Sequence, residues 1–418
     1  MNPSHIQIIG AALFGVALLH TFSTKFFERL AHTRPAHAGL WHLLGEVEVV
    51  FGFWAFVMMV VMFLTEGKAS ATHYLDTRNF TEPLFVFAIM VAAASKPILQ
   101  ASGWLTRMLA RALPLAPGWS FTLVTLTLVP LMGSFITEPA AMTLAALLLR
   151  DGLYCHPIST RLKYAVLGVL FVNVSIGGTL TPYAAPPVLM VASAWGWDLS
   201  FMFLHFGDKA ALAVAINALG LVALFNRELK SLPPLASPTE AAPPLLVTLI
   251  HTVFLAGIVV FAHHPPVFLS LFMLFLGFTA AYERYQSPLI LREGLLVAFF
   301  LAGLVVLGGQ QQWWLEPLLM KMDADAVFFG ATALTAITDN AALTYLGSLV
   351  QGLSDEFKYA LVAGAVTGGG LTIIANAPNP AGASILKGGF PDQAIHAGGL
   401  LLASLGPTVV ALLCFKLI

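Results

Sequence analysis

The chain has 418 residues, of which 58% are hydrophobic and only 10% are charged, against roughly 25% charged residues in an ordinary soluble domain. This composition excludes a water-soluble fold. A formal net charge of -1 with scattered basic residues also excludes the concentrated basic face that a nucleic-acid partner needs.

Apolar stretches of membrane-spanning length recur along the whole chain, since about 20 helical residues cross a bilayer core. The first, from His5 to His20, has neither the basic start nor the small-residue cleavage site of a signal peptide. The sequence therefore predicts an all-α polytopic membrane protein, with spans at 5–22, 41–64, 84–100, 164–194, 203–226, 245–263, 266–282, 294–309, 358–385 and 391–416.

Two further apolar stretches, 119–149 and 327–351, are too long for one crossing, and each contains a charged centre. They are predicted to be re-entrant hairpins, whose turns lie at mid-membrane depth where protein or a water-filled cavity satisfies the backbone. A Pro-rich segment near the middle is predicted to be a linker. The predicted division is an N-terminal helix and loop at 1–40, a first repeat at 41–230, the linker at 231–244 and a second repeat at 245–418.

The basic residues predict an N-terminus on the outside, because short cytoplasmic loops are enriched in Lys and Arg. In that orientation most of them fall in inside loops, namely Lys25, Arg29, Arg34, Arg107, Arg111, Arg150, Arg161, Lys163, Arg227, Lys230, Arg284, Arg292 and Lys387. The outside segments hold fewer, namely Lys68, Arg78, Lys321, Lys358 and Lys416.

The two halves repeat the same motifs in the same order. Ile136–Leu144 aligns with Ile337–Tyr345, which places Glu138 and Asp339 at equivalent positions, and Gly177–Thr181 aligns with 368–372. The predicted topology puts the first hairpin's base inside and the flanks of the second outside, so the repeats are inverted. Inverted repeats with broken helices at matching positions are typical of secondary transporters.

The segments Gly177–Pro182 and 368–380 cannot continue as regular helix, because glycine weakens a helix and proline lacks a donor. Unwound backbone and nearby side chains supply oxygen ligands for a desolvated cation. The predicted ligands here are Thr179, Thr181, Thr372, Asn376 and Asn379. The alternative is a Gly/Pro kink that only allows close helix packing.

Glu138 and Asp339 lie in stretches so apolar that a lone carboxylate would cost several kcal/mol, which makes each a candidate functional group. Such a carboxyl group can hold either a proton or a metal cation. The adjacent Thr137, Thr338 and Asn340 are candidates for the same ion and proton site, and Asp339, Glu138 and Asn340 are the predicted metal ligands. The alternative for Glu138 is a helix-start residue favoured by the local dipole.

Lys96 is predicted to lie three-quarters of the way along the span 84–100. It could pair with Asp339 or Glu138 and be displaced by a cation, or it could extend to the inner surface. Glu46 and Glu48 are predicted to be solvated carboxylates at the inner end of the second helix. Cys155 and Cys414 are far apart and suggest neither a disulfide framework nor a zinc site.

The segment Thr338–Thr344 resembles the Asp-Asn-x-Pro-x-Thr hairpin of sodium/proton antiporters and arsenite transporters in the ion transporter superfamily. Gly177–Pro182 resembles the Gly-Gly-Asn-Leu-Thr-Pro segment of that superfamily. The similarity covers roughly residues 80 to 390 and is closest to a group of sodium/proton antiporters. It implies two inverted repeats, each with a re-entrant hairpin and a discontinuous helix, usually assembled as a homodimer.

Three positions depart from the superfamily pattern: Ala342 replaces the hairpin proline, Thr179 stands where asparagine is common, and Glu138-Pro139 replaces an acid-amide pair. Dicarboxylate carriers of the superfamily have Ser-Asn-Thr at the hairpin tips. Two acids at these tips would repel a di-anionic substrate, so the sequence favours a cation.

The sequence thus predicts a secondary transporter that exchanges Na+ for protons across a bacterial inner membrane. The alternatives are a carrier of arsenite, an oxyanion or an organic anion, and a non-transporting scaffold or receptor. Motifs of zinc proteases, serine hydrolases and P-loop ATPases are absent from the sequence. No cofactor is expected beyond the transported cation, and the partners are protons and the lipid bilayer.

Overall fold

The computed structural model describes residues 3–233 and 241–418, and these residues form helices and connecting turns without a strand. Residues 234–240 of the predicted linker lie outside the described residues. The helices before it are α1 (His5–Thr33), α2 (Ala38–Leu44), α3 (Val47–Glu66), α4 (Lys68–Asp76), α5 (Thr81–Ala93), α6 (Lys96–Ala112), α7 (Pro117–Ile136), α8 (Glu138–Leu149), α9 (Thr160–Gly177), α10 (Pro186–Trp195), α11 (Leu199–Met202), α12 (Asp208–Leu224) and α13 (Asn226–Lys230).

The helices after the linker begin with a pair of short apolar helices and end at the C-terminus. They are α14 (Leu245–Val260), α15 (Pro265–Ala281), α16 (Leu291–Gly308), α17 (Gln312–Leu319), α18 (Ala324–Thr335), α19 (Asn340–Ser348), α20 (Asp355–Gly368), α21 (Asn379–Leu386) and α22 (Ala397–Leu417). Short turns of 3-10 helix, η3 (Gly178–Leu180) and η6 (Ile373–Ala375), follow α9 and α20.

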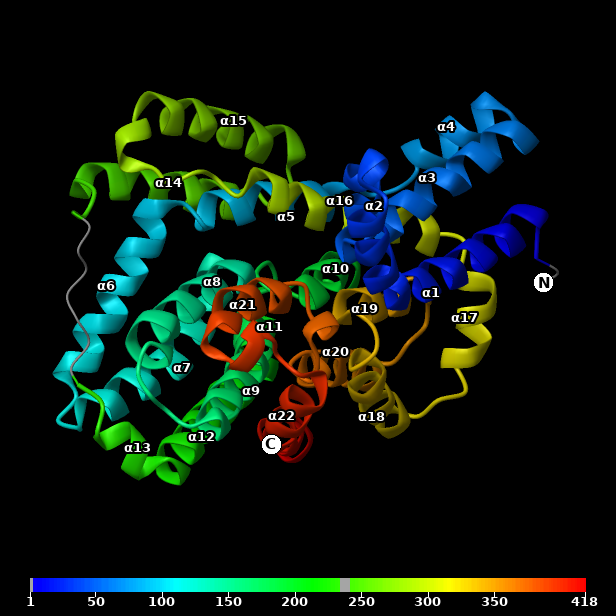
Figure 1. Ribbon diagram of the computed structural model, residues 1–418. Coiled ribbons are helices and arrows are strands. Elements are labelled where there is room, and N and C mark those ends of the chain that lie inside the picture. The colour runs from blue at the N-terminus through cyan, green and yellow to red at the C-terminus, as the bar shows by residue number, and fades with distance from the viewer. Residues whose placement is uncertain (1–2, 234–240) are drawn as a thin grey trace.

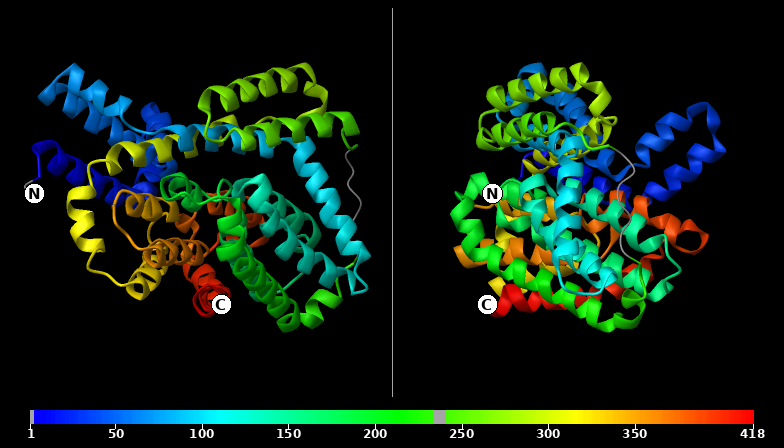
Figure 2. Two further views of the ribbon diagram at one scale, coloured as in Figure 1. Left: turned by 180° about the vertical axis from the view of Figure 1, so that it is seen from behind. Right: turned by 90° about the vertical axis from the view of Figure 1, so that its left-hand side faces the viewer.

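The helices form two layers, which Figure 1 shows one above the other and Figure 2 shows from behind and from the side. The upper layer contains α3, α5, α14, α15 and α16, and the lower layer contains α7 to α13 and α18 to α22. In the first half α6 leads from the upper to the lower layer, and in the second half α17 does so. The element order therefore repeats, whereas the inversion of the second half and the re-entry of both hairpins stay predictions.

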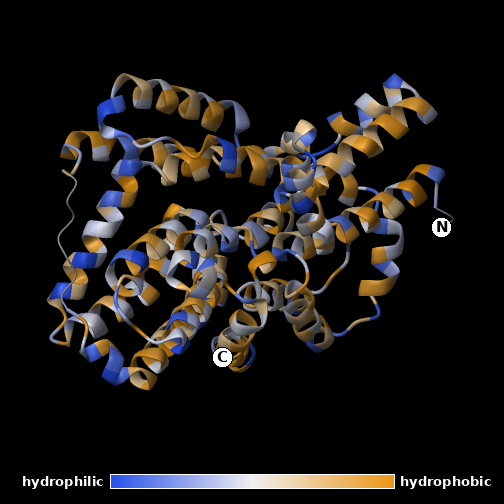
Figure 3. Cartoon of the chain, in the orientation of Figure 1, coloured by the Kyte–Doolittle hydropathy of each residue, from blue (hydrophilic) through white to orange (hydrophobic). Residues whose placement is uncertain are grey.

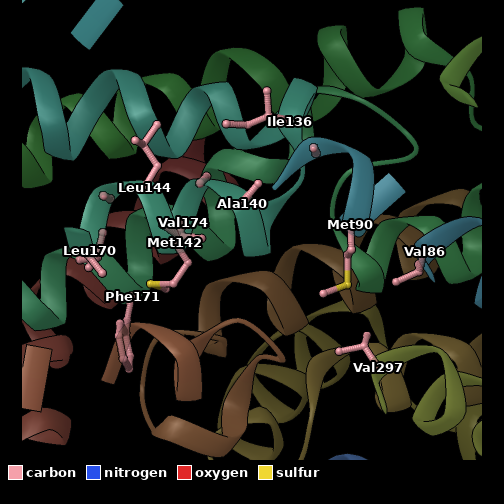
Figure 4. Packing of buried hydrophobic residues seen from close by; sticks show 14 of the residues in the cluster. Val86, Met90, Ile136, Ala140, Met142, Leu144, Leu170, Phe171, Val174 and Val297 are labelled. Atoms are coloured by element: carbon pink, nitrogen blue, oxygen red, sulfur yellow. The ribbon is translucent and has the colours of Figure 1, made fainter. Parts of the chain in front are cut away.

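The halves are interleaved in the lower layer. α8 packs against α21, and α10 packs against α19, so each hairpin contacts the broken helix of the other half. Met142 of α8 and Phe171 of α9 lie together in this core, beside α21, whereas Met90 of α5 lies opposite Val297 of α16, where these two upper-layer helices pack (Figure 4). The breaks in both halves are thereby brought to the middle of the molecule.

The outer surface is strongly apolar, and Figure 3 shows hydrophobic residues along most helices with polar residues at their ends. Leu64, Val253, Met273 and Leu402 are all more than 70% exposed. Soluble proteins rarely expose large contiguous apolar patches, so this surface suits a hydrocarbon environment. The protein is an integral, multi-pass membrane protein.

Several predicted spans differ from the helices of the structure. Among the described residues seven helices are long and apolar enough to cross a membrane, and the bent pair α5–α6 would add an eighth. The predicted spans 245–263 and 266–282 correspond to the shorter α14 and α15. Within the predicted hairpin 119–149, α7 is by itself long and apolar enough to cross a membrane. The predicted span 84–100 is not one straight helix, because the chain bends by 64° between α5 and α6.

Candidate functional site

The first break separates α7 from α8 at Thr137, whose φ of 74° lies in the left-handed region. For a β-branched residue this conformation is a genuine outlier, and it costs of order 1–3 kcal/mol. Glu138 follows as the first residue of α8, with Pro139 next, where proline fits the start of a helix. The strained turn therefore fixes the direction in which the Glu138 side chain leaves the backbone.

Glu138 is completely buried. Its Oε2 accepts a hydrogen bond from Asn376 Nδ2 at 2.9 Å, whereas Oε1 has no hydrogen-bond partner among the described residues. An unpaired buried polar atom costs about 1–3 kcal/mol, and more for a charged group. One oxygen of this carboxyl group is therefore free to bind a proton or a cation.

The break in the first discontinuous helix lies directly against Glu138. α9 ends at Gly177, and a Cβ atom on Gly178 would lie 2.5 Å from Glu138 Oε1. Ser134 of α7 donates to the Gly177 carbonyl and accepts from the Leu180 N–H at 2.9 Å. This serine, one turn before Glu138, holds the unwound segment in place, and the sequence prediction missed it because a serine in a helix carries no distinctive pattern.

The two threonines predicted as ligands in this segment both donate to backbone carbonyls. Thr181 Oγ1 donates to the Ser134 carbonyl at 2.6 Å, on the hairpin beside Glu138. Thr179 Oγ1 donates to the Ile176 carbonyl of its own helix at 2.7 Å. Thr181 therefore ties the break to the hairpin tip, whereas Thr179 closes the last turn of α9.

The second break separates α18 from α19, and Asp339 is the N-cap residue of α19. Its Oδ1 accepts from the Ala341 N–H at 2.8 Å and from the Ala342 N–H at 3.3 Å. Asp339 is half-buried, as is Thr338 beside it. The carboxylate is thus anchored to the helix start through one oxygen, which is a common N-cap arrangement.

Asn340, the next residue, is fully buried, and neither atom of its amide has a partner among the described residues. A Cβ atom on Gly369, at the end of α20, would lie 2.9 Å from Asn340 Nδ2 and in contact with Ser175 Oγ of α9. Ser175 in turn donates to the Val366 carbonyl of α20 at 2.7 Å. Asn340 therefore lies where the broken helices of the two halves cross.

The second discontinuous helix contributes two amides. Thr372 Oγ1 donates to the Ala336 carbonyl of the hairpin at 2.9 Å, and Asn379 Nδ2 donates to the Gly369 and Thr372 carbonyls at 2.8 and 2.9 Å. The side-chain oxygens of Asn376 and Asn379 remain without partners among the described residues. Both amides thus donate through nitrogen and leave an oxygen available.

The acids of the two halves are connected through Asn376, which donates to Glu138 and lines one cavity with Asp339. Around them the structure places several buried oxygens without partners among the described residues: Thr137 Oγ1, Glu138 Oε1, Asn340 Oδ1, Asn376 Oδ1 and Asn379 Oδ1. No group of three His, Cys, Asp or Glu side chains suited to a metal ion occurs in the described part of the chain. A mixed set of carboxylate and amide oxygens instead suits a hard cation such as Na+.

Lys96 was predicted to lie three-quarters of the way along a helix, but the structure places it at a helix start. It is the first residue of α6, directly after Ser95 at the bend, and it is half-buried. Its pairing with Asp339 or Glu138 stays a prediction. The difference arises because Lys96-Pro97 begins a helix, where proline is tolerated, and does not interrupt one.

Cavities between the layers reach the two breaks. One of about 550 Å³ is lined by Pro182 and Tyr183 of the first break together with Glu82, Asp198 and His263. Another, of about 30 Å³, reaches the second break and is lined by Glu48, Asp339 and Asn376. Glu48, predicted to be a solvated carboxylate, is half-buried and lines this cavity.

A comparison with protein families places almost the whole chain in one of them. The family described as "Putative Na+/H+ antiporter" matches residues 5–418. No curated protein matches the chain.

Proposed function

The chain belongs to this antiporter family, and we propose that it exchanges Na+ for protons at the centre formed by Glu138 and Asp339. The observation that carries the proposal is the fully buried Glu138 carboxyl, which has one oxygen free and accepts a hydrogen bond from Asn376, a residue that lines one cavity with Asp339. A fully buried acid beside a half-buried one needs neutralisation, because a desolvated lone charge is costly.

Protons and Na+ compete for the same oxygens in this proposal. A bound Na+ takes Glu138 Oε1 and amide oxygens such as Asn340 Oδ1 and Asn379 Oδ1, which are otherwise unpartnered. Protonation of the carboxyl groups removes the negative charge that holds the ion and releases it. Because the carboxyl groups hold either Na+ or protons, the uphill movement of one can be driven by the other.

Binding at the facing breaks also suits alternating access between inverted repeats, in which one site is exposed to each side in turn. We infer that the second half is inverted relative to the first, that both hairpins are re-entrant and that the N-terminus lies outside a bacterial inner membrane. Assembly as a homodimer and displacement of Lys96 by the cation belong to the same proposal.

The rival is a carrier of arsenite, an oxyanion or an organic anion. An anion needs positive or donor groups at the site, whereas the unpartnered atoms beside Glu138 are predominantly oxygens. A non-transporting scaffold or receptor would leave this buried set without a ligand. The cation is therefore the substrate that these side chains favour.

The test is proton movement in liposomes that contain the purified protein and a pH-sensitive dye. Addition of NaCl should drive protons across the membrane, and choline chloride should not. A tenfold higher proton concentration on the side of Na+ addition should raise the KM for Na+, because the two compete. Proton movement with arsenite or succinate but not with Na+ would favour the anion rival.

A further inference from the structure

Glu48 lies at the second break, although nothing in the sequence connects it with Asp339. It is the second residue of α3 in the upper layer and lines the cavity of about 30 Å³ together with Asp339 and Asn376 of the lower layer. The rest of the lining is mainly apolar and includes Val297, Phe300 and Ile374. The three polar side chains therefore share a small and otherwise apolar space.

The neighbouring acid on the same helix start differs in its surroundings. Glu46, two residues earlier, forms an ion pair with Arg292. Glu48 instead lines the same small cavity as Asp339. Two carboxylates that face one small cavity repel each other unless a positive charge lies between them.

An independent observation indicates that the cavity accommodates a ligand. Asn376 is only 1% exposed, and its Oδ1 has no partner among the described residues. Its Nδ2 donates to Glu138, which fixes the orientation of the amide, and Asn376 lines the cavity. A cavity needs about 10–15 Å³ to hold a water molecule, so a volume of about 30 Å³ has room for one small ion with a water molecule.

We propose that this cavity is a Na+ site in which Glu48, Asp339 and Asn376 Oδ1 supply the ligands. It differs from the site at Glu138 Oε1 but is joined to it by Asn376, which contacts both. Na+ enters between the layers beside α3 and passes across Asn376 to Glu138. This inference rests on the proposed exchange for the role of the site, although Na+ binding itself can be measured without transport.

The test is direct binding of radioactive 22Na+ to the full-length protein purified in detergent. Glu48→Gln should raise the Kd for Na+ at least tenfold, because it removes one of the two charges, and Glu48→Asp should retain part of the affinity. Glu66→Gln is the matched control, since Glu66 is an exposed acid at the other end of α3. This control should leave the Kd unchanged.

A second variant tests the same site in case Glu48→Gln does not fold. Ile374→Phe fills the cavity without removing an oxygen, and it should weaken Na+ binding in the same way. Each variant should elute as a single species in size-exclusion chromatography and keep its Tm in Na+-free buffer. Wild-type affinity in both folded variants would overturn the inference.

Liposome measurements separate this inference from the exchange function. If the wild type binds Na+ in a Glu48-dependent manner but moves no protons, the proposed Na+ site at Glu48 is supported and the proposed Na+/proton exchange is wrong. If Na+ drives proton movement in the wild type, and Glu48→Gln has the wild-type Kd and KM for Na+, the proposed exchange is supported and the proposed Glu48 site is wrong. Absence of Na+ binding in the wild type would contradict both.

Discussion

The two acids at the hairpin tips have different surroundings although they occupy equivalent positions in the sequence. Glu138 is completely buried and is bound by Asn376 from the other half, whereas Asp339 is half-buried and caps its own helix. Glu138 therefore contacts the second broken helix directly, and Asp339 reaches it across the cavity beside Glu48. The equivalence of the repeats does not extend to the local chemistry.

Asp339→Asn should reduce Na+-driven proton movement at least a hundredfold while the protein remains folded. Asparagine keeps the capping oxygen that the Ala341 and Ala342 N–H groups use, but it can neither release a proton nor neutralise a cation. Dye-monitored proton movement in liposomes gives the rate, and the Tm should change by no more than a few degrees. Unimpaired exchange in the folded variant would show that a group other than Asp339 carries the proton.

Glu138→Gln is the companion experiment, because the repeat makes Glu138 the obvious substitute carrier. It should abolish exchange as well, since the buried site loses its ionisable group. If both single variants exchanged Na+ at the wild-type rate, the paired-acid mechanism would be wrong. The arsenite or organic-anion proposal would then be the better one.

Gly178→Ala should impair Na+ binding through Glu138 without a change in charge. The added Cβ would lie 2.5 Å from Oε1 and 2.6 Å from Cγ of Glu138, so the carboxyl group must move. We expect a Kd for Na+ at least tenfold higher, measured with 22Na+. Gly207→Ala is the control, because its Cβ would meet no atom closer than 3.5 Å; equal affinities in the two variants would count against this placement of Glu138.

At the scale of elements, the upper layer depends on the crossing of α3 and α16. Gly303 of α16 lies so close to the backbone of Phe51 and Gly52 in α3 that a Cβ atom would overlap it. Small residues allow such close approach of helices in membranes. This crossing places Glu48 at the start of α3 near the second break, so its geometry affects the proposed site as well as the fold.

Gly303→Ala should lower stability, because backbone atoms cannot move aside as a flexible side chain can. Overpacking of this kind costs typically 1–3 kcal/mol, and we expect a Tm several degrees lower in a detergent-based thermal unfolding assay. Gly277→Ala in α15 is the control, since its Cβ would meet nothing within 4 Å. A Tm for Gly303→Ala equal to that of this control would show that the helices separate without cost.

At the scale of the whole molecule, α6 of the first half and α17 of the second half lead from the upper to the lower layer (Figure 1). The broken helices lie in the lower layer, and the cavities between the layers reach both breaks. The cavity at the first break is much the larger, at about 550 Å³ against about 30 Å³. The first break therefore borders the larger space between the layers.

The orientation in the membrane can be tested with the native cysteines. Cys155 is exposed and Cys414 is buried, and an outside N-terminus places Cys155 on the cytoplasmic side. A membrane-impermeant maleimide should therefore label the protein in inside-out vesicles but not in intact cells. Cys155→Ser should remove the label, and labelling of Cys155 in intact cells would reverse the predicted topology.

The sequence by itself determined the membrane class, the helix breaks and the acids at the tips. The apolar composition of the chain indicates the membrane class. The helix preferences of glycine and proline act over a few residues, so α9 ends at Gly177 and α20 ends at Gly368 as expected. The same local rules misjudged Lys96, because a Lys-Pro pair can begin a helix as well as interrupt one.

Only the tertiary structure decided which side chains meet. The hydrogen bond between Asn376 and Glu138 joins residues 238 positions apart, and Glu48 reaches Asp339 only because α3 packs on α16. Ser134 likewise binds an unwound segment more than 40 residues later. Such contacts depend on how helices pack in three dimensions, and a single sequence carries no periodicity or composition that encodes them.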